Sequence, residues 1–528
     1  MSTVTSNLTT KTGYLNAKKI VDGVQNNSNN LYVYIGRPRP WTTTADDPPP
    51  VLNTLEEEYD VFHDMTALKR VGSQDITLGF KKIDWTSGVV YDEYSDDVDL
   101  SDKNFYVYTD EKKVYKCISN NNGVASTAKP NHTTDNIVET IDGYRWKYMF
   151  TISDSLHRKF AFGDYLPISF DDDVVAGAVV GSIDHLKLID GGTGYPINAT
   201  VGSETNPEIP IYVLGDGEET ATATCNVITS GGVIQSISSI TDQGSGYPLS
   251  QEGTVPVMFR QVGNTGAIET AFGIATTGVN GQIINVELKL GGSGYTDGAV
   301  TIVQSSAYGY AETNSSGDIT NVEISVARNG TGFRKAQAVV VAPSMTEANI
   351  KPVISPFRGH GVSPERELFA KYVIINLSFA YNEGEGDFTI ENEFRRIGLI
   401  ENPLAYGTDT PATARTLNAK QVLEVENVTG AFNPDDEIYG LTSGAVGLYV
   451  DTISADHIRF IQDENILTNK DFVAGEEIRS SSGASATITS IINPEIEPYS
   501  GDISFINNTI AVDRTSDQIE TIALVIEY

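Results

Sequence analysis

The chain has 528 residues, with 36 basic and 70 acidic side chains and a formal net charge of −34 at pH 7. Because nucleic-acid binders present basic patches to phosphates, we expect no nucleic-acid partner. The length exceeds what a single hydrophobic core sustains, so several domains are expected.

The first ten residues have neither a basic start nor an apolar core, so no signal peptide is predicted. The longest apolar stretch, residues 174–180, is far shorter than the roughly 20 residues that span a bilayer. We therefore expect synthesis in a cytoplasm and no membrane insertion. Cys117 and Cys225 lie in different regions of the chain and are expected to be free thiols, as is typical of a reducing compartment.

The N-terminal region begins with a predicted helix over residues 13–25, in which apolar side chains recur every three or four positions. A strand then leads into Gly36–Trp41 and a stiff, proline-rich segment at 46–50. A second helix is predicted around residues 55–68. The strands expected up to residue 170 include 31–35, 104–108, 113–119 and 144–152.

Between residues 181 and 345, a strand-like segment ends four times in a Gly-x-Gly-aromatic corner. The corner residues expected to be structural are Gly194, Tyr195, Gly246, Tyr247, Gly294, Tyr295, Gly332 and Phe333. An aliphatic residue precedes each aromatic by seven positions: Leu188, Ile240, Leu288 and Val326. Each copy begins after a glycine: Gly181, Gly232, Gly281 and Gly317. The uneven spacing of the corners favours a compact set of duplicated strand pairs over a regular solenoid.

A second duplication follows the predicted strands 371–379 and 395–400. The pattern Phe-x-x-x-x-Glu-Ile occurs at 432–438 and again at 472–478, and Ser-Gly-Ala at 443–445 and again at 482–484. Each copy continues into a predicted strand, at 446–450 and 485–489, and a closing strand is predicted at 521–526.

The chain is therefore predicted to be mainly β and multidomain, with β-sandwich-like domains and a small α/β part at the N-terminus. Its body is predicted to comprise residues 1–180, 346–403 and 494–528. Two inserted, repeat-built β modules, at 181–345 and 404–493, interrupt that body.

Six blocks of the body resemble the baseplate wedge protein of contractile-tailed bacteriophages, the gene-product-eight type. The blocks are Tyr34–Trp41, Ile83–Trp85, Val114–Cys117, Asp142–Phe150, Arg395–Pro403, and Ser500–Ile503 continuing through Asn507, Asn508, Arg514, Gln518, Ile519 and Glu520. They occur in the order of the family and cover the body, about half the chain. The two inserts depart from it, since smaller members of the family lack them. The Gly-x-Gly-Tyr strands are similar to those of other tail proteins of large phages.

The resemblance implies a largely β structural protein of the virion, located in the tail baseplate and assembled in the host cytoplasm. It implies a homodimer inside each baseplate wedge that packs against other wedge proteins and accommodates the rearrangement at sheath contraction. It implies neither an enzyme nor a cofactor.

Sequence motifs give no independent indication of catalysis. The chain has no Gly-x-Ser-x-Gly elbow, no phosphate-binding loop and no His-Glu-x-x-His. The acidic run Asp92–Asp102 lacks the glycine and the closing glutamate of an EF-hand, so a solvated loop is expected, with calcium binding left open. Residues 358–361 with Glu365 and Glu367 offer one imidazole and two carboxylates, but we interpret them as a turn whose polar groups face solvent or partners. No metal site is predicted.

Large aromatic side chains are expected to fill the core of the β body, at Trp41, Trp85, Tyr144 and Trp146. A subunit contact is predicted at Arg37, Arg39 and Trp41, beside the rigid proline-rich segment, because arginine and tryptophan anchor interfaces.

The alternative function is that of a carbohydrate-binding adhesin or tail-fibre-like protein recognising a host surface glycan. It requires the rings of Tyr195, Tyr247 and Tyr295 to be exposed.

Overall fold

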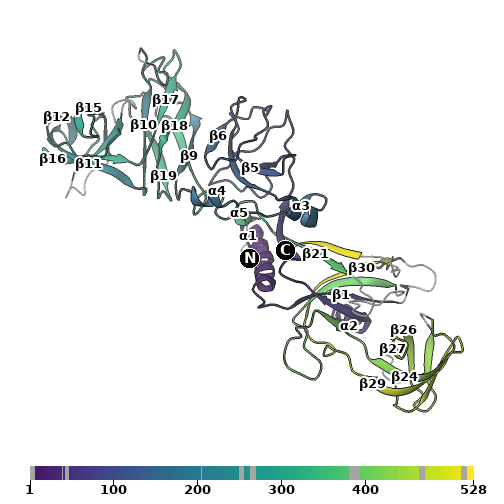
Figure 1. The fold of residues 1–528 in the computed structure, drawn as a ribbon. Coiled ribbons are helices and arrows are strands. Elements are labelled where there is room, and N and C mark those ends of the chain that lie inside the picture. The colour runs from purple at the N-terminus through teal and green to yellow at the C-terminus, as the bar shows by residue number, and fades with distance from the viewer. Residues whose placement is uncertain are drawn as a thin grey trace. The chain divides into compact units, whose positions relative to one another are not determined.

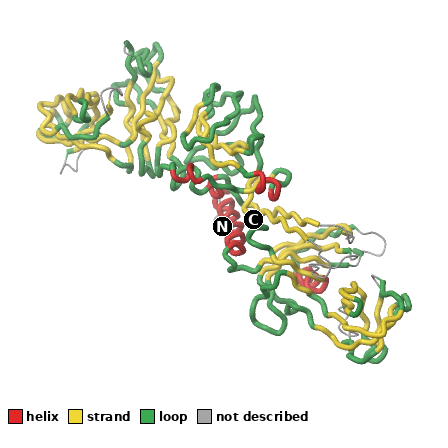
Figure 2. The backbone as a smooth tube through the Cα atoms, in the orientation of Figure 1, coloured by secondary structure: helices red, strands yellow, loops and turns green. Residues whose placement is uncertain are grey.

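The computed structural model describes residues 6–38, 40–41, 47–203, 205–248, 255–261, 269–379, 393–433, 436–462, 470–512 and 520–528. As predicted, the fold is mainly β and has several separate sheets (Figures 1 and 2). The chain divides into two compact units. Unit 1 consists of Met1–Thr10, Lys81–Asp154 and Ile168–Phe369, and unit 2 of Lys11–Phe80, Ser155–Pro167 and Ala370–Tyr528. None of the described helices is long and apolar enough to cross a bilayer.

Unit 2 is built on a five-stranded antiparallel sheet in the order β23-β2-β1-β22-β30. Its strands are β1 (Leu31–Gly36), β2 (Met65–Arg70), β22 (Phe394–Glu401), β23 (Thr416–Asn418) and β30 (Asp502–Val512). The central strand β1 is buried along its whole length, and Tyr32, Tyr34 and Ile400 belong to the core of this sheet. Three segments far apart in the sequence thus lie side by side as β1, β22 and β30 (Figure 1).

The helix predicted around residues 55–68 ends earlier than expected. Helix α2 spans Leu55–Asp64, and the next four residues belong to β2. Met65, Ala67 and Leu68 are all buried, on both faces of that strand. Thr66 and Lys69 of the same strand are buried as well. Because both faces are covered, the strand lacks the alternation of apolar and polar residues that distinguishes a half-buried strand from a helical segment.

A second antiparallel sheet of unit 2 has the order β31-β21-β3-β8. Its strands are β3 (Ile76–Lys81), β8 (Tyr165–Pro167), β21 (Tyr372–Phe379) and β31 (Glu520–Glu527). The first helix, α1 (Ser6–Gln25), begins before the predicted residue 13, and α3 spans Asp154–Phe160. At Gly13 helix α1 approaches the C-terminus so closely that a Cβ atom would lie 2.1 Å from the carbonyl oxygen of Tyr528.

The C-terminal repeat of unit 2 forms a closed barrel in the order β24-β27-β26-β25-β28-β29. Its strands are β24 (Val422–Thr429), β25 (Glu437–Gly440), β26 (Val446–Ser454), β27 (His457–Ile461), β28 (Glu477–Ser480) and β29 (Ser485–Ile492). The two sequence copies meet where β25 pairs with β28, and the equivalent residues Ile438 and Ile478 are both fully buried.

Each of the two sequence copies in this barrel also contributes a carboxylate that accepts hydrogen bonds from the other copy. Glu476 of the second copy accepts hydrogen bonds from the N–H groups of Thr442, Ser443 and Val473 and from the Ser443 hydroxyl. The equivalent Asp436 of the first copy accepts from the Ser481 and Ser482 hydroxyls of the second. Burial acts to raise the pKa of both carboxyls, but these hydrogen bonds outweigh it and hold each pKa below its ordinary value.

The Glu476→Gln substitution should destabilise the C-terminal barrel by about 1.5–3 kcal/mol, because an uncharged amide replaces a carboxylate that accepts four hydrogen bonds. A carboxyl with a lowered pKa contributes stability above its unfolded pKa, near about pH 4, and this contribution is lost as the pH falls further. The barrel of the wild-type protein should therefore lose more stability than the variant on acidification. Hydrogen exchange of the β25 and β28 amides measures both effects. Glu477→Gln, at an exposed neighbour paired with Arg479, is the control; equal effects of the two substitutions would contradict the assignment.

Unit 1 contains a four-stranded antiparallel sheet in the order β4-β5-β7-β6. Its strands are β4 (Tyr106–Tyr108), β5 (Lys113–Ser119), β6 (Ile137–Glu139) and β7 (Arg145–Thr151). Tyr144 and Trp146 are fully buried and stack with ring centroids 5.4 Å apart, as predicted, whereas Trp85 and Trp41 are half-buried. Cys117 and Cys225 are free thiols, and both are buried.

The Gly-x-Gly region of unit 1 contains two barrel-like sheets with separate cores. We call the first the outer repeat barrel; its strands are β9 (Ile183–Asp190), β10 (Ile209–Gly215), β17 (Ala307–Thr313), β18 (Ile319–Asn329), β19 (Ala336–Val340) and β20 (Asn349–Ile354). The second is the nested repeat barrel, with β11 (Glu219–Ser230), β12 (Val233–Asp242), β13 (Val255–Arg260), β14 (Ala271–Thr277), β15 (Ile283–Leu290) and β16 (Gly298–Ser305). The chain enters and leaves the nested barrel side by side, since Ser306 N–H donates to Glu218 O at 2.9 Å.

The two repeat barrels correspond strand for strand. Neighbours around the outer barrel follow the order β9-β18-β17-β10-β19-β20, and around the nested barrel β12-β15-β14-β13-β16-β11. The sixth strand in these orders is β20 in the outer barrel, where it comes last in the chain, and β11 in the nested barrel, where it comes first. The two barrels are therefore circular permutations of one strand arrangement. An apolar cluster that includes Tyr212, Phe272 and Val341 joins them.

These units divide the chain differently from the domains predicted. The inserted module does not end at residue 345, because β20 pairs with β9 and completes the outer barrel. The predicted body of 1–180, 346–403 and 494–528 is shared between the units, since residues 81–154 cluster with the repeat barrels. Two short helices, α4 (Asp172–Ala176) and α5 (Pro364–Glu367), flank the barrels in sequence.

Candidate functional site

The four Gly-x-Gly-aromatic corners join the repeat copies in reciprocal pairs. The backbone N–H of each aromatic residue donates to the carbonyl of the glycine that begins its partner copy. These bonds are Tyr195 to Gly317 at 3.0 Å, Phe333 to Gly181 at 3.1 Å, Tyr247 to Gly281 at 3.1 Å and Tyr295 to Gly232 at 2.8 Å. Copies one and four thus close the outer barrel, and copies two and three close the nested one.

The corners require glycine for two reasons. Both glycines of every corner have a positive φ, between 58° and 84°, a region that side chains disfavour. At three of the four starting glycines, Gly181, Gly281 and Gly317, space is also lacking; a Cβ on Gly181 would lie 2.4 Å from the backbone nitrogen of Phe333. The eight corner residues predicted to be structural are therefore placed at barrel closures.

The corner rings are all buried, with 2–4% of their surface exposed. The hydroxyl of Tyr247 donates to Ile302 O at 2.9 Å, and that of Tyr295 to Phe259 O at 2.7 Å. The Tyr195 hydroxyl accepts from Ala348 N–H at 2.8 Å. Rings held in this way offer no face to a sugar. The carbohydrate-binding alternative required exposed tyrosine rings, and this condition is not met.

Residues from three blocks of the body meet in one buried charge cluster in unit 2. Arg396, on β22, is 2% exposed; its guanidinium pairs with Glu57 at 2.5 Å and Asp64 at 3.4 Å, and donates to Asn508 Oδ1 at 3.0 Å. Arg37 Nη1 also pairs with Asp64, at 3.0 Å. Burial acts to raise the pKa of Asp64, but a hydrogen bond from His63 and the two guanidinium charges hold it below its ordinary value. The cluster therefore fixes β22 and the turn after β1 against helix α2.

The predicted subunit contact lies next to this cluster. Trp41 Nε1 donates to Thr509 O at 2.9 Å, and the guanidinium of Arg37 lies 4.3 Å from the centroid of the tryptophan ring. Arg37 and Trp41 are both half-buried and contact the chain's own residues. Arg39 lies outside the described residues. A partner contact at these three positions stays a prediction.

The imidazole and carboxylates weighed as a metal site in the sequence have a different environment. His360 and Glu367 are buried rather than facing solvent, and Lys116 of β5 lies between them. Its ammonium pairs with the Glu367 carboxylate and lies 3.1 Å from His360 Nδ1, while His360 Nε2 lies 2.7 Å from Asp184 Oδ2. Since an ammonium only donates, Nδ1 accepts and Nε2–H donates to Asp184. Burial lowers the pKa of His360, which keeps the ring neutral.

Lysine thus occupies the space between imidazole and carboxylate that a cation would need. Across the ranges that the structure describes, no group of three histidine, cysteine or acidic side chains is arranged to hold a metal ion.

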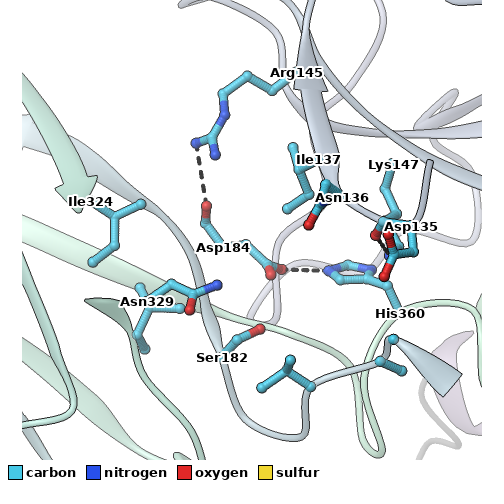
Figure 3. Close-up of a pocket in the computed structure, with 14 residues that line it drawn as sticks. Asp135, Asn136, Ile137, Arg145, Lys147, Ser182, Asp184, Ile324, Asn329 and His360 are labelled. Carbon is cyan, nitrogen blue, oxygen red and sulfur yellow. Dashed lines mark hydrogen bonds and ion pairs between the residues drawn. The ribbon is translucent and has the colours of Figure 1, made fainter. Parts of the chain in front are cut away.

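A pocket of about 190 Å³ adjoins this network in unit 1 (Figure 3). It lies between the sheet strands β6 and β7 and the outer repeat barrel. Its polar lining residues are Asp135, Asn136, Arg145, Lys147, Ser182, Asp184, Asn329 and His360. Val179, which also lines it, is 40% exposed, so the pocket opens to solvent.

The acidic run at residues 92–102 is a loop with Asp96, Asp97, Asp99 and Asp102 exposed, as predicted, but part of it also contacts the outer repeat barrel. Glu93 pairs with Lys187 of β9, and Asp96 and Asp97 pair with Lys351 of β20. The run therefore holds the outer repeat barrel through lysines on two of its strands.

Sequence reasoning missed Lys116, Arg145, Lys147 and Asp184, which build the network and the pocket. Each lies in a strand where charged and apolar residues mix, as in Arg145–Thr151. Charged residues on a half-buried strand usually face solvent, and no short motif marks these. Only the pairing of distant strands reveals that they converge.

Comparison of the chain with models of known protein families and with curated proteins gives no match.

Proposed function

We propose that the chain is a structural subunit of the baseplate wedge of a contractile phage tail. It assembles in the host cytoplasm as a homodimer with other wedge proteins, resides in the virion and accommodates the baseplate rearrangement at sheath contraction. It carries out no reaction and needs no cofactor.

The observation that supports this proposal is the spatial convergence of three of the six resembling blocks; the other three belong to unit 1. Tyr34–Trp41, Arg395–Pro403 and Ser500–Asn508 are distant in sequence, yet they supply the adjacent strands β1, β22 and β30. Their side chains Arg37, Arg396 and Asn508 belong to one buried cluster. Blocks chosen for resemblance alone have no reason to be neighbours unless they belong to a common fold.

The repeat barrels suit the same role. Their conspicuous glycines and aromatics are used in closing barrels, and the conspicuous His360 and Glu367 are used in a network with Lys116. Side chains committed to internal contacts build a rigid part rather than a catalytic centre. The carbohydrate-binding alternative has no support from the buried corner tyrosines.

Sedimentation of the purified chain tests the homodimer. We expect a dimer that survives excision of residues 219–305, because the nested barrel enters and leaves the outer barrel at one point. In the excised variant, a short glycine-serine turn joins Glu218 to Ser306. Tyr212→Thr and Val339→Thr replace apolar side chains that the excision would expose to solvent. A monomeric full-length chain would contradict the proposal, and a dimer lost on excision would place the dimer contact on the nested barrel.

A further inference from the structure

The pocket of Figure 3 contains two cations that lack carboxylate partners. Arg145 and Lys147 are two positions apart on β7 and so lie on the same face of the sheet. Arg145 Nη1 donates to the backbone oxygen of Asp184 at 3.3 Å, and Lys147 Nζ donates to the backbone oxygen of Asp135. Among the residues that the structure describes, neither head group forms an ion pair. Lys147 is only 4% exposed.

Carboxylates act on both cations through space, without pairing directly with either head group among the described residues. Burial lowers the pKa of both groups, whereas Asp184, Glu139 and Glu323 act in the opposite direction on Arg145, and Asp135, Asp184 and Glu367 on Lys147. The Asp184 carboxylate is bound by His360 Nε2 at 2.7 Å, and Asp135 lies beside Lys147 (Figure 3). Arg145 is therefore the cation whose remaining N–H donors are available to a ligand. A guanidinium presents these donors in a planar fork that matches two oxygens of an oxyanion.

The opposite wall of the pocket adds neutral donors. Asn329, at the end of β18, and Ser182, just before β9, line it from the outer repeat barrel, and Asn136 lines it from the edge of β6. The volume of about 190 Å³ equals about six water molecules at liquid density. That space accommodates a tetrahedral oxyanion with part of its hydration shell.

We propose that this pocket binds a small oxyanion of the size of sulfate or phosphate, held by Arg145 of the sheet and by Asn329 and Ser182 of the outer repeat barrel. The anion bridges two elements that pack together in unit 1, so it stabilises the attachment of the barrel to the sheet. This inference does not depend on the proposed baseplate function.

Isothermal titration of the full-length chain with sodium sulfate tests the site, with sodium chloride at equal ionic strength as the reference. Direct heats are preferable to a thermal shift, since sulfate stabilises most proteins through exclusion from their surface. We expect saturable binding at one site per chain. Arg145→Gln should weaken it by about tenfold or more, because the charge-assisted fork is lost. Arg479→Gln, at an exposed arginine of the C-terminal barrel, should leave the affinity unchanged.

Two results would overturn the proposal: no saturable heat with the wild-type chain, or equal affinities of the wild-type and Arg145→Gln chains. Circular dichroism checks that Arg145→Gln is folded. If it is not, Asn329→Asp serves as the second variant. It keeps Arg145 and replaces the amide on the opposite wall by a carboxylate of nearly the same size, which repels an anion. It should weaken sulfate binding by a comparable factor, and unchanged affinity there would also overturn the proposal.

Discussion

We expect the Gly281→Ala substitution to open the nested repeat barrel and Gly231→Ala to leave it closed. The two glycines have similar backbone conformations but different surroundings. Their φ angles are +67° and +60°. A Cβ on Gly281 would lie 2.6 Å from the carbonyl oxygen of Tyr247, whereas a Cβ on Gly231 would meet nothing within 4 Å. The pair therefore separates conformational strain from steric clash within one barrel.

The magnitudes follow from those two effects. A side chain in the left-handed region costs about 1–2 kcal/mol at either position. At Gly281 the backbone of Tyr247 must also move, and its buried N–H then loses its acceptor, which adds about 1–3 kcal/mol. Hydrogen exchange of the β12 and β15 amides should therefore accelerate strongly in Gly281→Ala and only slightly in Gly231→Ala. Equal acceleration in both variants would mean that the reciprocal corner bonds do not close the barrel.

The Lys116→Met substitution should destabilise unit 1 by about 3–5 kcal/mol, because it leaves the Glu367 carboxylate buried without its partner. Lys116 and Glu367 are 1% and 6% exposed in their side chains. The double substitution Lys116→Met and Glu367→Gln removes both charges and should recover part of the loss. Chemical unfolding of unit 1, followed by the fluorescence of Trp85 and Trp146, measures these differences.

The matched control is Lys129→Met. Lys129 also pairs with two carboxylates, those of Asp110 and Glu111, but its side chain is 31% exposed and that of Asp110 78%. Exposed pairs of this kind contribute little to stability, because solvent screens them. If Lys116→Met were as mild as this control, the network around His360 would not hold the sheet to the outer barrel.

Local sequence patterns predicted the strands well. Alternation and apolar runs indicated β1, β5, β7, β21, β22 and β31 to within a few residues. The Gly-x-Gly-aromatic corners and their starting glycines were recognisable because positive φ angles and close backbone approach leave a compositional signature. The overrun of α2 into β2 shows where this fails, since burial on both faces removes the period-two signal.

The pairing of the copies could not be read from the sequence. Copies one and two are adjacent in the chain, yet copy one closes with copy four, because the nested barrel is inserted between β10 and β17. Register and partner choice in a sheet depend on tertiary packing, which leaves no local mark. The same holds for Lys116 and Asp184, whose meeting at His360 depends on how β5 and β9 are brought together.

The most direct test of the baseplate proposal is immunogold electron microscopy of phage particles from the source culture, with antibody raised against the purified chain. The proposal predicts gold confined to the end of the tail. Particles without gold, with the antigen in host cells or in the medium, would contradict it.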